Sequence, residues 1–338
     1  MAQQRWIRTE ILLLIAGLLL IVYLLGNVLL LVLAAIILAI GFDGATKAIM
    51  RKSGLAHGWA LAAVGIGLLS IIAAAIGLTA TRLAQQFREL AQTIVATAQR
   101  LQNWLQDIGI LDFVDNIDGS GDSLTGAAGN LMGQMMTMGM SVVGAISSLL
   151  FLIVLAFFLA ADPGLYRRGV LRLIPPGGRD PVADTFAAIS HAVRWWFLGQ
   201  LVSMAFLGTT VGLGLFLLGV DLWFALAVLT ALVTFVPFIG PLIATVPIVA
   251  VSFTESTQTG LIVLAGYIVI ENIEGNVVTP MIQQRAVNLP PALLIGLQVL
   301  LGVVFGAIGL ILAAPLTVMT MVAVQKLWVE HMLGEKVT

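Results

Sequence analysis

The sequence predicts an all-α, polytopic membrane protein with about eight transmembrane helices, broken or re-entrant segments and an extramembrane helical hairpin arm. Three observations support this prediction. Hydrophobic residues make up 60% of the 338-residue chain and charged residues only 10%, whereas charged residues are nearer a quarter of a soluble domain. Apolar runs long enough to span a bilayer recur along the chain. Glycine and proline interrupt several of these runs, which is typical of broken membrane helices.

The first apolar run, residues 11–40, is too long for one upright crossing. Thirty helical residues span about 45 Å, whereas the hydrocarbon core is about 30 Å thick. Arg5 and Arg8 precede the run, and Lys47 and Arg51 follow it. Because basic flanks favour the cytoplasm, an even number of crossings is expected. We therefore expect two short helices joined near residues 26–27, with one tilted helix as the alternative.

Residues 59–80 form the next predicted span, so that residues 1–80 hold the N-terminal transmembrane helices. From Leu83 to Ile108, apolar residues recur in steps of three and four, which predicts one apolar stripe on a helix that leaves the membrane. An acidic loop at residues 112–122 follows. Residues 81–138 are thus predicted to form an extracytoplasmic amphipathic helical arm, whose stripe packs either within the hairpin or on a neighbouring subunit.

Residues 139–338 are predicted to form a C-terminal transmembrane transport region. A span over residues 141–161 should end at Asp162–Pro163, because proline disfavours helical geometry in the residue before it. The arginine-rich segment 162–196 is expected to be a cytoplasmic loop that ends in an amphipathic helix at residues 182–196. The next span, residues 197–218, contains glycines that permit close helix contact.

Two later apolar segments are interrupted. The run 222–251 is expected to be broken at Pro237, Gly240, Pro241 and Pro247. A second segment, which begins at Tyr267, acquires polar side chains before Gly275 and Pro280 break it. Two broken segments of this kind indicate a transport site. Buried polar groups beside a span are costly, and chains keep them where they line water, a pore or a partner. The predicted substrate path comprises Pro237, Gly240, Pro241, Glu271, Asn272, Glu274, Gly275, Asn276, Pro280, Gln283, Gln284, Arg285, Pro290 and Pro291.

Structural interpretations of the same residues stay open. The breaks could be kinks that merely pack, Glu271 and Arg285 could form a structural ion pair, and Asn276 could cap a helix. In the last predicted span, residues 292–324, Gly302, Gly306 and Gly309 are expected to form a small-residue stripe. The distribution of lysine and arginine favours cytoplasmic N and C termini.

Two motifs carry a resemblance to a known family. The run ENIEGNVVTPMIQQRAVNLPP at residues 271–291 resembles the C-terminal signature of the autoinducer-2 exporter family, the PerM-like permeases. FVPFIGP at residues 235–241 is similar to its second signature. The resemblance covers nearly the whole chain in segment order. It implies export of the furanone autoinducer-2 or a related metabolite, a link of some members to sodium–proton exchange, and a homo-oligomer, suspected to be a pentamer.

The composition excludes several classes of function. A net charge of −1 argues against a nucleic-acid surface, and the absence of cysteine excludes disulfides and thiolate metal sites. No nucleotide-binding or catalytic motif occurs at workable spacing, so we expect no enzyme, no cofactor and no metal site.

The favoured function is gradient-driven or channel-like transport of a small polar solute, without ATP, across the inner (cell) membrane. The expected partners are the lipid bilayer, the solute and further copies of the chain. A sodium–proton antiporter that uses Glu271 and Glu274 is one alternative. A scaffold that binds partners through its arm is another.

Overall fold

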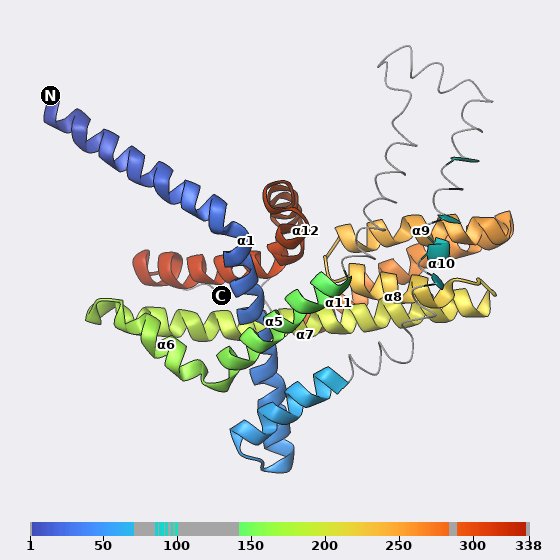
Figure 1. Cartoon of the computed structure of the whole chain (residues 1–338), viewed down its shortest axis with the longest axis horizontal. Helices are drawn as coiled ribbons and strands as arrows, with labels where there is room; N and C mark the ends of the chain where they lie inside the picture. The colour runs from blue at the N-terminus through green and yellow to red at the C-terminus, as the bar shows by residue number, and fades with distance from the viewer. Residues whose placement is uncertain are drawn as a thin grey trace. The chain divides into compact units, whose positions relative to one another are not determined.

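The computed structural model describes residues 2–70, 85–86, 88–90, 92–93, 96, 99–100, 142–283 and 289–335 (Figure 1). Helices and short turns account for these residues, and no strand occurs among them. They fall into two compact units, which we describe separately. The first takes its residues from 1–65, 150–197 and 285–338, and the second from 66–149 and 198–284. The predicted all-α class is confirmed.

Several helices are long and apolar enough to cross a membrane, so the chain is a multi-pass membrane protein. Three shorter apolar helices, at His57–Ser70, Trp223–Val233 and Ile239–Glu255, add to them. The total of about eight crossings stays a prediction, as does the division at residues 80 and 138. The four candidate spans in the described part of the chain are Leu25–Ser53, Pro176–Leu217, Thr257–Met281 and Pro291–Met332, and the bent pair Leu149–Ala161 and Pro163–Arg172 makes a fifth.

The first helix of the first unit, α1 (Ala2–Ser53), is continuous through Gly26, so the predicted hairpin near residues 26–27 is wrong. Glycine is needed at position 26 for a close contact with another helix, and the chain does not turn there. A Cβ atom built on Gly26 would lie 2.1 Å from Cε1 of Phe305, far inside van der Waals contact. Glycine stands at this position because an aromatic ring of another helix occupies the space that a side chain would need.

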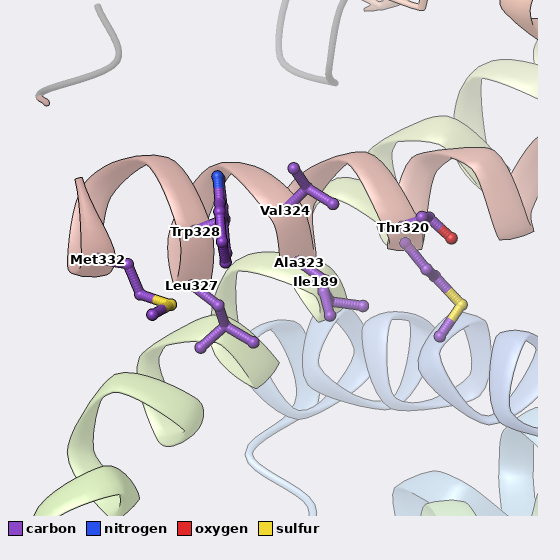
Figure 2. A pocket seen from close by; sticks show the side chains of 8 residues that line it. Ile189, Thr320, Ala323, Val324, Leu327, Trp328 and Met332 are labelled. Atoms are coloured by element: carbon purple, nitrogen blue, oxygen red, sulfur yellow. The ribbon is translucent and has the colours of Figure 1, made fainter. Parts of the chain in front are cut away.

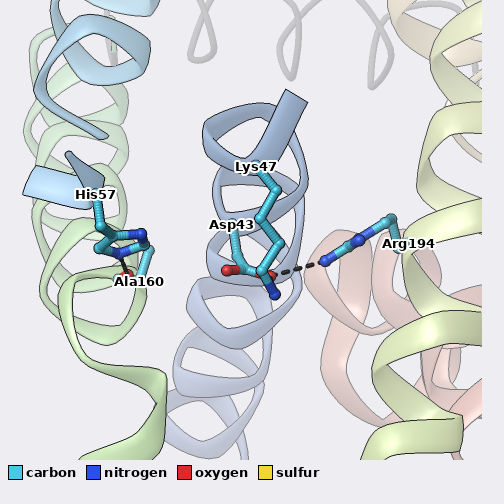
Figure 3. Close-up of polar contacts among 5 residues, drawn as sticks. All are labelled: Asp43, Lys47, His57, Ala160 and Arg194. Carbon is cyan, nitrogen blue, oxygen red and sulfur yellow. Dashed lines mark hydrogen bonds and ion pairs between the residues drawn. The ribbon is translucent and has the colours of Figure 1, made fainter. Parts of the chain in front are cut away.

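Polar contacts fasten the C-terminal half of α1 to its neighbours in the first unit. The Asp43 carboxylate oxygen Oδ2 accepts hydrogen bonds from Nζ of Lys47 and from Nη2 of Arg194, both at 2.7 Å (Figure 3). The Asp43 side chain is only 15% exposed. One ring nitrogen of His57 lies 3.2 Å from the carbonyl oxygen of Ala160 and joins helix His57–Ser70 to α5 (Val142–Ala161).

The chain bends by 77° between α5 and α6 (Pro163–Arg172). Asp162 occupies the bend, where its Oδ1 atom accepts a hydrogen bond of 2.9 Å from the backbone N–H of Leu165. Pro163 then starts α6, as is favourable at a first helical position. The predicted helix end at Asp162–Pro163 is confirmed. After a 3₁₀ turn, η1 (Pro176–Gly178), helix α7 runs from Arg179 to Leu217 and unites the expected helix 182–196 with the expected span 197–218.

Small residues bring α7 against α8 (Trp223–Val233) in the second unit. A Cβ atom on Gly208 would lie 2.7 Å from Cβ of Ala231, and one on Gly212 would lie 2.7 Å from Cβ of Ala227. Glycines and alanines four residues apart therefore face each other, which is how helices approach closely in membranes. The predicted close contact of the span 197–218 is confirmed at Gly208 and Gly212 but not at Gly214, where no heavy atom lies within 4 Å of an added Cβ.

Helices α9 (Ile239–Glu255) and α10 (Thr257–Ile273) form a hairpin beside α8 (Figure 1). Ser256 occupies the turn, and its Oγ atom accepts a hydrogen bond of 3.0 Å from the N–H of Thr259 to cap α10. The core of this unit joins α7, α8, α9 and α10 and includes the buried residues Val211, Leu215, Leu226, Ala244, Ile248, Val263 and Tyr267.

Two residues of the predicted arm are fixed on this core. Leu90, part of the predicted stripe, is fully buried within it. Gln86 accepts a hydrogen bond of 3.2 Å from the backbone N–H of Ala225 and so caps the first turn of α8. The beginning of the arm thus packs on its own chain. Residues 101–138, which complete the predicted arm and include the acidic loop, lie outside the described residues.

Helix α12 (Pro291–Ala323) changes direction along its length (Figure 1). The kink is at Gly306, whose φ of 65° and ψ of −148° are open only to glycine. A Cβ atom on Gly309 would lie 2.1 Å from the carbonyl oxygen of Leu301, whereas residues eight apart in a straight helix are about 12 Å apart. The chain therefore doubles back here, and the predicted glycine stripe is wrong. A π-helical segment, η3 (Val324–Met332), follows α12.

Candidate functional site

The first broken segment is a tight turn between α8 and α9. Phe238 has a φ of 63° and a ψ of −57°, and the N–H of Ile239 donates to the carbonyl of Pro237 at 2.7 Å. This is a γ-turn with positive φ, a rare and strained conformation for a residue with a side chain. Gly240 is required beside it, since a Cβ atom there would lie 2.0 Å from the carbonyl oxygen of Val233. The predicted break at Pro237, Gly240 and Pro241 is confirmed, whereas the predicted interruption at Pro247 is wrong, because α9 continues through that residue.

Side chains satisfy backbone carbonyls that this turn exposes. Nε2 of Gln200, a buried residue of α7, donates a hydrogen bond of 2.5 Å to the carbonyl of Thr234 at the end of α8. Oη of Tyr267, in α10, donates one of 2.8 Å to the carbonyl of Pro241 in the first turn of α9. Buried carbonyls need such partners, because water is absent from the bilayer core. Side chains of α7 and α10 therefore support the backbone at this break.

The second predicted break is a widened helix. Residues Glu274–Val278 form a π-helical turn, η2, in which the N–H of Thr279 donates to the carbonyl of Glu274, five residues back. The short helix α11 (Thr279–Gln283) continues in the same direction, so one helical stretch runs from Thr257 to Met281. The prediction that Gly275 and Pro280 interrupt the helix is therefore wrong, because Gly275 lies within the π turn and Pro280 is the second residue of α11. π-helical turns are uncommon in proteins, and those that do occur are often found at functional sites.

The carboxylate of Glu274 is the centre of a polar cluster. Its Oε1 atom accepts a hydrogen bond of 2.5 Å from Oγ of Ser203 and one of 2.7 Å from Oγ1 of Thr279. Ser203 is only 5% exposed, and Glu274 is half-buried. The other carboxylate oxygen, Oε2, has no donor among the described side chains. Glu274 is thus held firmly by one oxygen, while the other remains available to an additional hydrogen-bond donor.

Helix α7 contributes to both segments through adjacent residues on one face. Gln200 and Ser203 are three positions apart and so point the same way. Gln200 holds the end of α8, and Ser203 holds Glu274. The two segments that the sequence singles out are therefore connected within the second unit, by α7 on one side and by Tyr267 on the other. We call Gln200, Ser203, Tyr267, Glu274 and Thr279 the polar cluster.

Other predicted path residues behave differently. The side-chain amide of Asn272 donates to the carbonyl of Ile268 at 2.7 Å, and that of Asn276 to the carbonyl of Asn272 at 3.0 Å. Each amide thus bonds its own helix one turn back, although both residues are exposed. Glu271 is half-buried and forms no hydrogen bond or ion pair with another described side chain.

The remaining predicted residues do not join the polar cluster. Gly275 and Pro280 are exposed on the helix that carries Glu274. Pro290 and Pro291 belong to the first unit, where they begin α12. Only the backbone of Gln283 is described. Gln284 and Arg285 lie outside the described residues, so the ion pair of Glu271 with Arg285 stays a prediction.

Sequence reasoning missed Gln200, Ser203 and Thr279. A signal for the first two exists, since they are polar residues three apart inside a mostly apolar span. Such a pair marks one face of a helix as polar. Thr279 gives no comparable signal, because threonine satisfies its own hydroxyl in many membrane helices by bonding a carbonyl one turn back. Thr230, Thr245 and Thr317 do so in this chain.

The first unit contains an apolar groove of about 470 Å³ (Figure 2). Nearly all of its lining is hydrocarbon, so it does not extend a path for a polar solute. No group of three or more histidine, aspartate or glutamate side chains able to hold a metal occurs in the described ranges. The groove is lined by Ile189 of α7 and by Met319, Thr320, Ala323, Val324, Leu327, Trp328 and Met332 of α12 and η3.

The chain is similar to known transport proteins. Over 271 residues it is 26% identical to the "AI-2 transport protein TqsA" of Escherichia coli strain K12, an alignment that covers 77% of this chain and 76% of that protein. It is 25% identical over 260 residues to the "Putative transport protein YueF" of Bacillus subtilis strain 168, with 74% and 70% covered. The model of the AI-2E family transporters matches residues 12–328. The chain therefore belongs to the AI-2E transporter family and is a permease for small solutes embedded in a lipid bilayer.

Proposed function

We propose that this permease moves a small polar solute along a path beside the polar cluster. The single observation that supports this best is the Glu274 carboxylate, which one membrane helix carries and a second helix holds through Ser203. An ionised group within a membrane-spanning helix is costly unless it contacts water, a substrate or a partner group. Glu274 offers an oxygen acceptor to the hydroxyl groups of a polyhydroxylated solute.

Autoinducer-2, a hydroxylated furanone, fits this chemistry and is the solute class that we propose, with export as the direction. The name of the relative TqsA agrees with autoinducer-2 as the solute. We propose gradient-driven or channel-like movement without ATP, in the inner membrane of the cell, with both termini cytoplasmic and several copies of the chain assembled together. Pro237, Gly240 and Pro241 shape the path, and Glu271, Asn272 and Asn276 line it on the exposed face of α10 and η2.

A sodium–proton antiporter is the second candidate. One observation favours it: a carboxylate oxygen and two hydroxyl oxygens converge at Glu274, and hard cations prefer oxygen ligands. In this case the carboxylate would bind sodium and a proton alternately. A scaffold function remains a third proposal and rests on the arm at residues 81–138.

Flux into sealed proteoliposomes of the purified protein separates these candidates. We would measure furanone and sodium uptake, each with and without a pH gradient, and repeat both with Glu274→Gln. Furanone flux that falls in the variant supports the permease proposal, whereas sodium flux that requires the pH gradient supports the antiporter. Movement of neither solute by folded protein would contradict both and favour the scaffold.

A further inference from the structure

The orientation of α6 relative to the membrane follows from the orientation of α5. The 77° bend at Asp162 separates α6 from α5, and α5 is mostly apolar and carries no charged residue. Membrane helices tilt on average by about 20° from the bilayer normal. If α5 crosses with such a tilt, α6 lies within roughly 35° of the membrane plane. A helix of ten residues is about 15 Å long, so in this orientation its two ends differ in depth by at most about 9 Å.

The sequence of α6 gives it an apolar face and a basic face, although Leu165, 56% exposed and seven residues before Arg172, lies on the basic side. Tyr166, Val170 and Leu173, the last at its C-cap, are spaced four and three residues apart and therefore share one face. They are exposed to 45%, 45% and 85% of their surfaces. Arg168 and Arg172, four residues apart, occupy a different face. No residue of α6 is buried, so the described protein covers neither face fully.

The positive charge of α6 is almost uncompensated. Arg167, Arg168 and Arg172 fall within the helix, which contains no acidic residue. Arg168 approaches Asp162 only to 3.8 Å, and both side chains are more than half exposed. Arg167 and Arg172 form no ion pair with another described residue. Guanidinium groups in this state are suited to bind phosphate oxygens, often through two hydrogen bonds at once.

We propose that α6 is an interfacial helix that binds the headgroups of anionic phospholipids. Tyr166, Val170 and Leu173 enter the boundary between headgroups and acyl chains, while Arg168 and Arg172 bind lipid phosphates. Charge complementarity selects this partner over water or an apolar protein surface. The arginines disfavour a re-entrant position in the hydrocarbon core, because each is expensive at that depth.

The natural absence of cysteine provides a direct test. Single cysteines introduced at residues 165–173 can be labelled uniquely with a nitroxide in the full chain, reconstituted in vesicles of phosphatidylcholine and phosphatidylglycerol. Relaxation by oxygen, which concentrates in lipid, is compared with relaxation by a water-soluble nickel complex. We expect the oxygen signal to peak at 166, 170 and 173 and the nickel signal at 168 and 172.

Two results would overturn the proposal. If all nine positions respond mainly to nickel, α6 lies in water. If 166, 170 and 173 respond to neither reagent, a second protein surface covers the apolar face. Labels at residues 150–158 of α5 supply a reference for lipid exposure, since Leu150, Phe151 and Phe158 are more than half exposed.

The choice of headgroup needs a separate measurement. Binding of fluorescent phosphatidylglycerol to the purified protein is compared for the natural chain and the double variant Arg168→Gln/Arg172→Gln. We expect a loss of affinity of about fivefold for each arginine, with binding of phosphatidylcholine unchanged. Arg51→Gln/Lys52→Gln, which removes two exposed charges at the end of α1, is the matched control. An equal loss in the control, or none in α6, would contradict a specific site.

Discussion

Oγ of Ser203 lies 2.5 Å from Oε1 of Glu274, 71 residues further along the chain. This contact joins α7 to the π-helical turn η2. A hydrogen bond to a charged group is worth about 1.5–3 kcal/mol, roughly twice a neutral one. Among the carboxylates of the described residues in the second unit, only that of Glu274 bonds a side chain of another helix.

Replacing Ser203 with alanine should lower solute flux by about tenfold or more, because Glu274 loses one of its two donors. The measurement is furanone uptake by proteoliposomes at matched protein content. Ser252→Ala is the control, since the Ser252 hydroxyl is buried but bonds only its own helix, at Ile248. Equal flux in Ser203→Ala and the natural chain would remove Ser203 from the path.

Glu274→Gln should abolish most flux while the protein remains folded. Glutamine keeps the size of the side chain but removes the charge, and it offers a weaker acceptor to Ser203 and Thr279. Asn276→Leu should reduce flux less, because the Asn276 amide already bonds the carbonyl of Asn272. The reverse order of the two effects would place the path on the exposed face of η2 and away from Glu274.

Gly240→Ala should destabilise the second unit by about 2–4 kcal/mol, since the new methyl group would lie 2.0 Å from the Val233 carbonyl oxygen and the turn must move. Thermal unfolding in detergent measures the change. Gly266→Ala in α10 is the matched control, because no heavy atom lies within 4 Å of its added Cβ. There alanine should be neutral or stabilise the helix by up to about 1 kcal/mol. A similar melting temperature for both variants would argue against the close contact.

Asp43→Asn should destabilise the first unit by about 2 kcal/mol, because the Arg194 guanidinium, only 30% exposed, loses its partner. Full burial would cost more, so this figure is reduced for the residual exposure. Lys47→Gln should change stability by less than about 1 kcal/mol, since Lys47 is 61% exposed. A double-mutant cycle of Asp43→Asn with Arg194→Gln isolates the pair, and additive effects would show that the contact contributes nothing.

Local sequence rules predict the features that depend on neighbouring residues. Pro163 ends α5 and starts α6, and the prolines and glycine at residues 237–241 separate α8 from α9, as expected from proline geometry. The apolar composition likewise predicts the all-α membrane fold. The cluster of polar residues near Glu274 is visible in the sequence because polar groups are rare in apolar spans.

Features that depend on distant residues could not be predicted. Gly26 suggests a turn until the ring of Phe305 is found against it, and Gly306 looks like part of a stripe until its backbone angles are known. Ser203 differs from other serines only by its partner, which lies on another helix. The π turn at Glu274–Val278 has no compositional mark, since glycine and proline there are equally compatible with a break.

The placement of Gln200 and Ser203 on a single face of α7 has a mechanical consequence. Less than one helical turn separates the contact to Thr234 from the contact to Glu274, so any rotation or shift of this part of α7 strains both contacts together. The C-terminal end of α8 and the π turn are therefore coupled through one short segment of α7. A force applied at either contact is transmitted to the other without passing through the hairpin of α9 and α10.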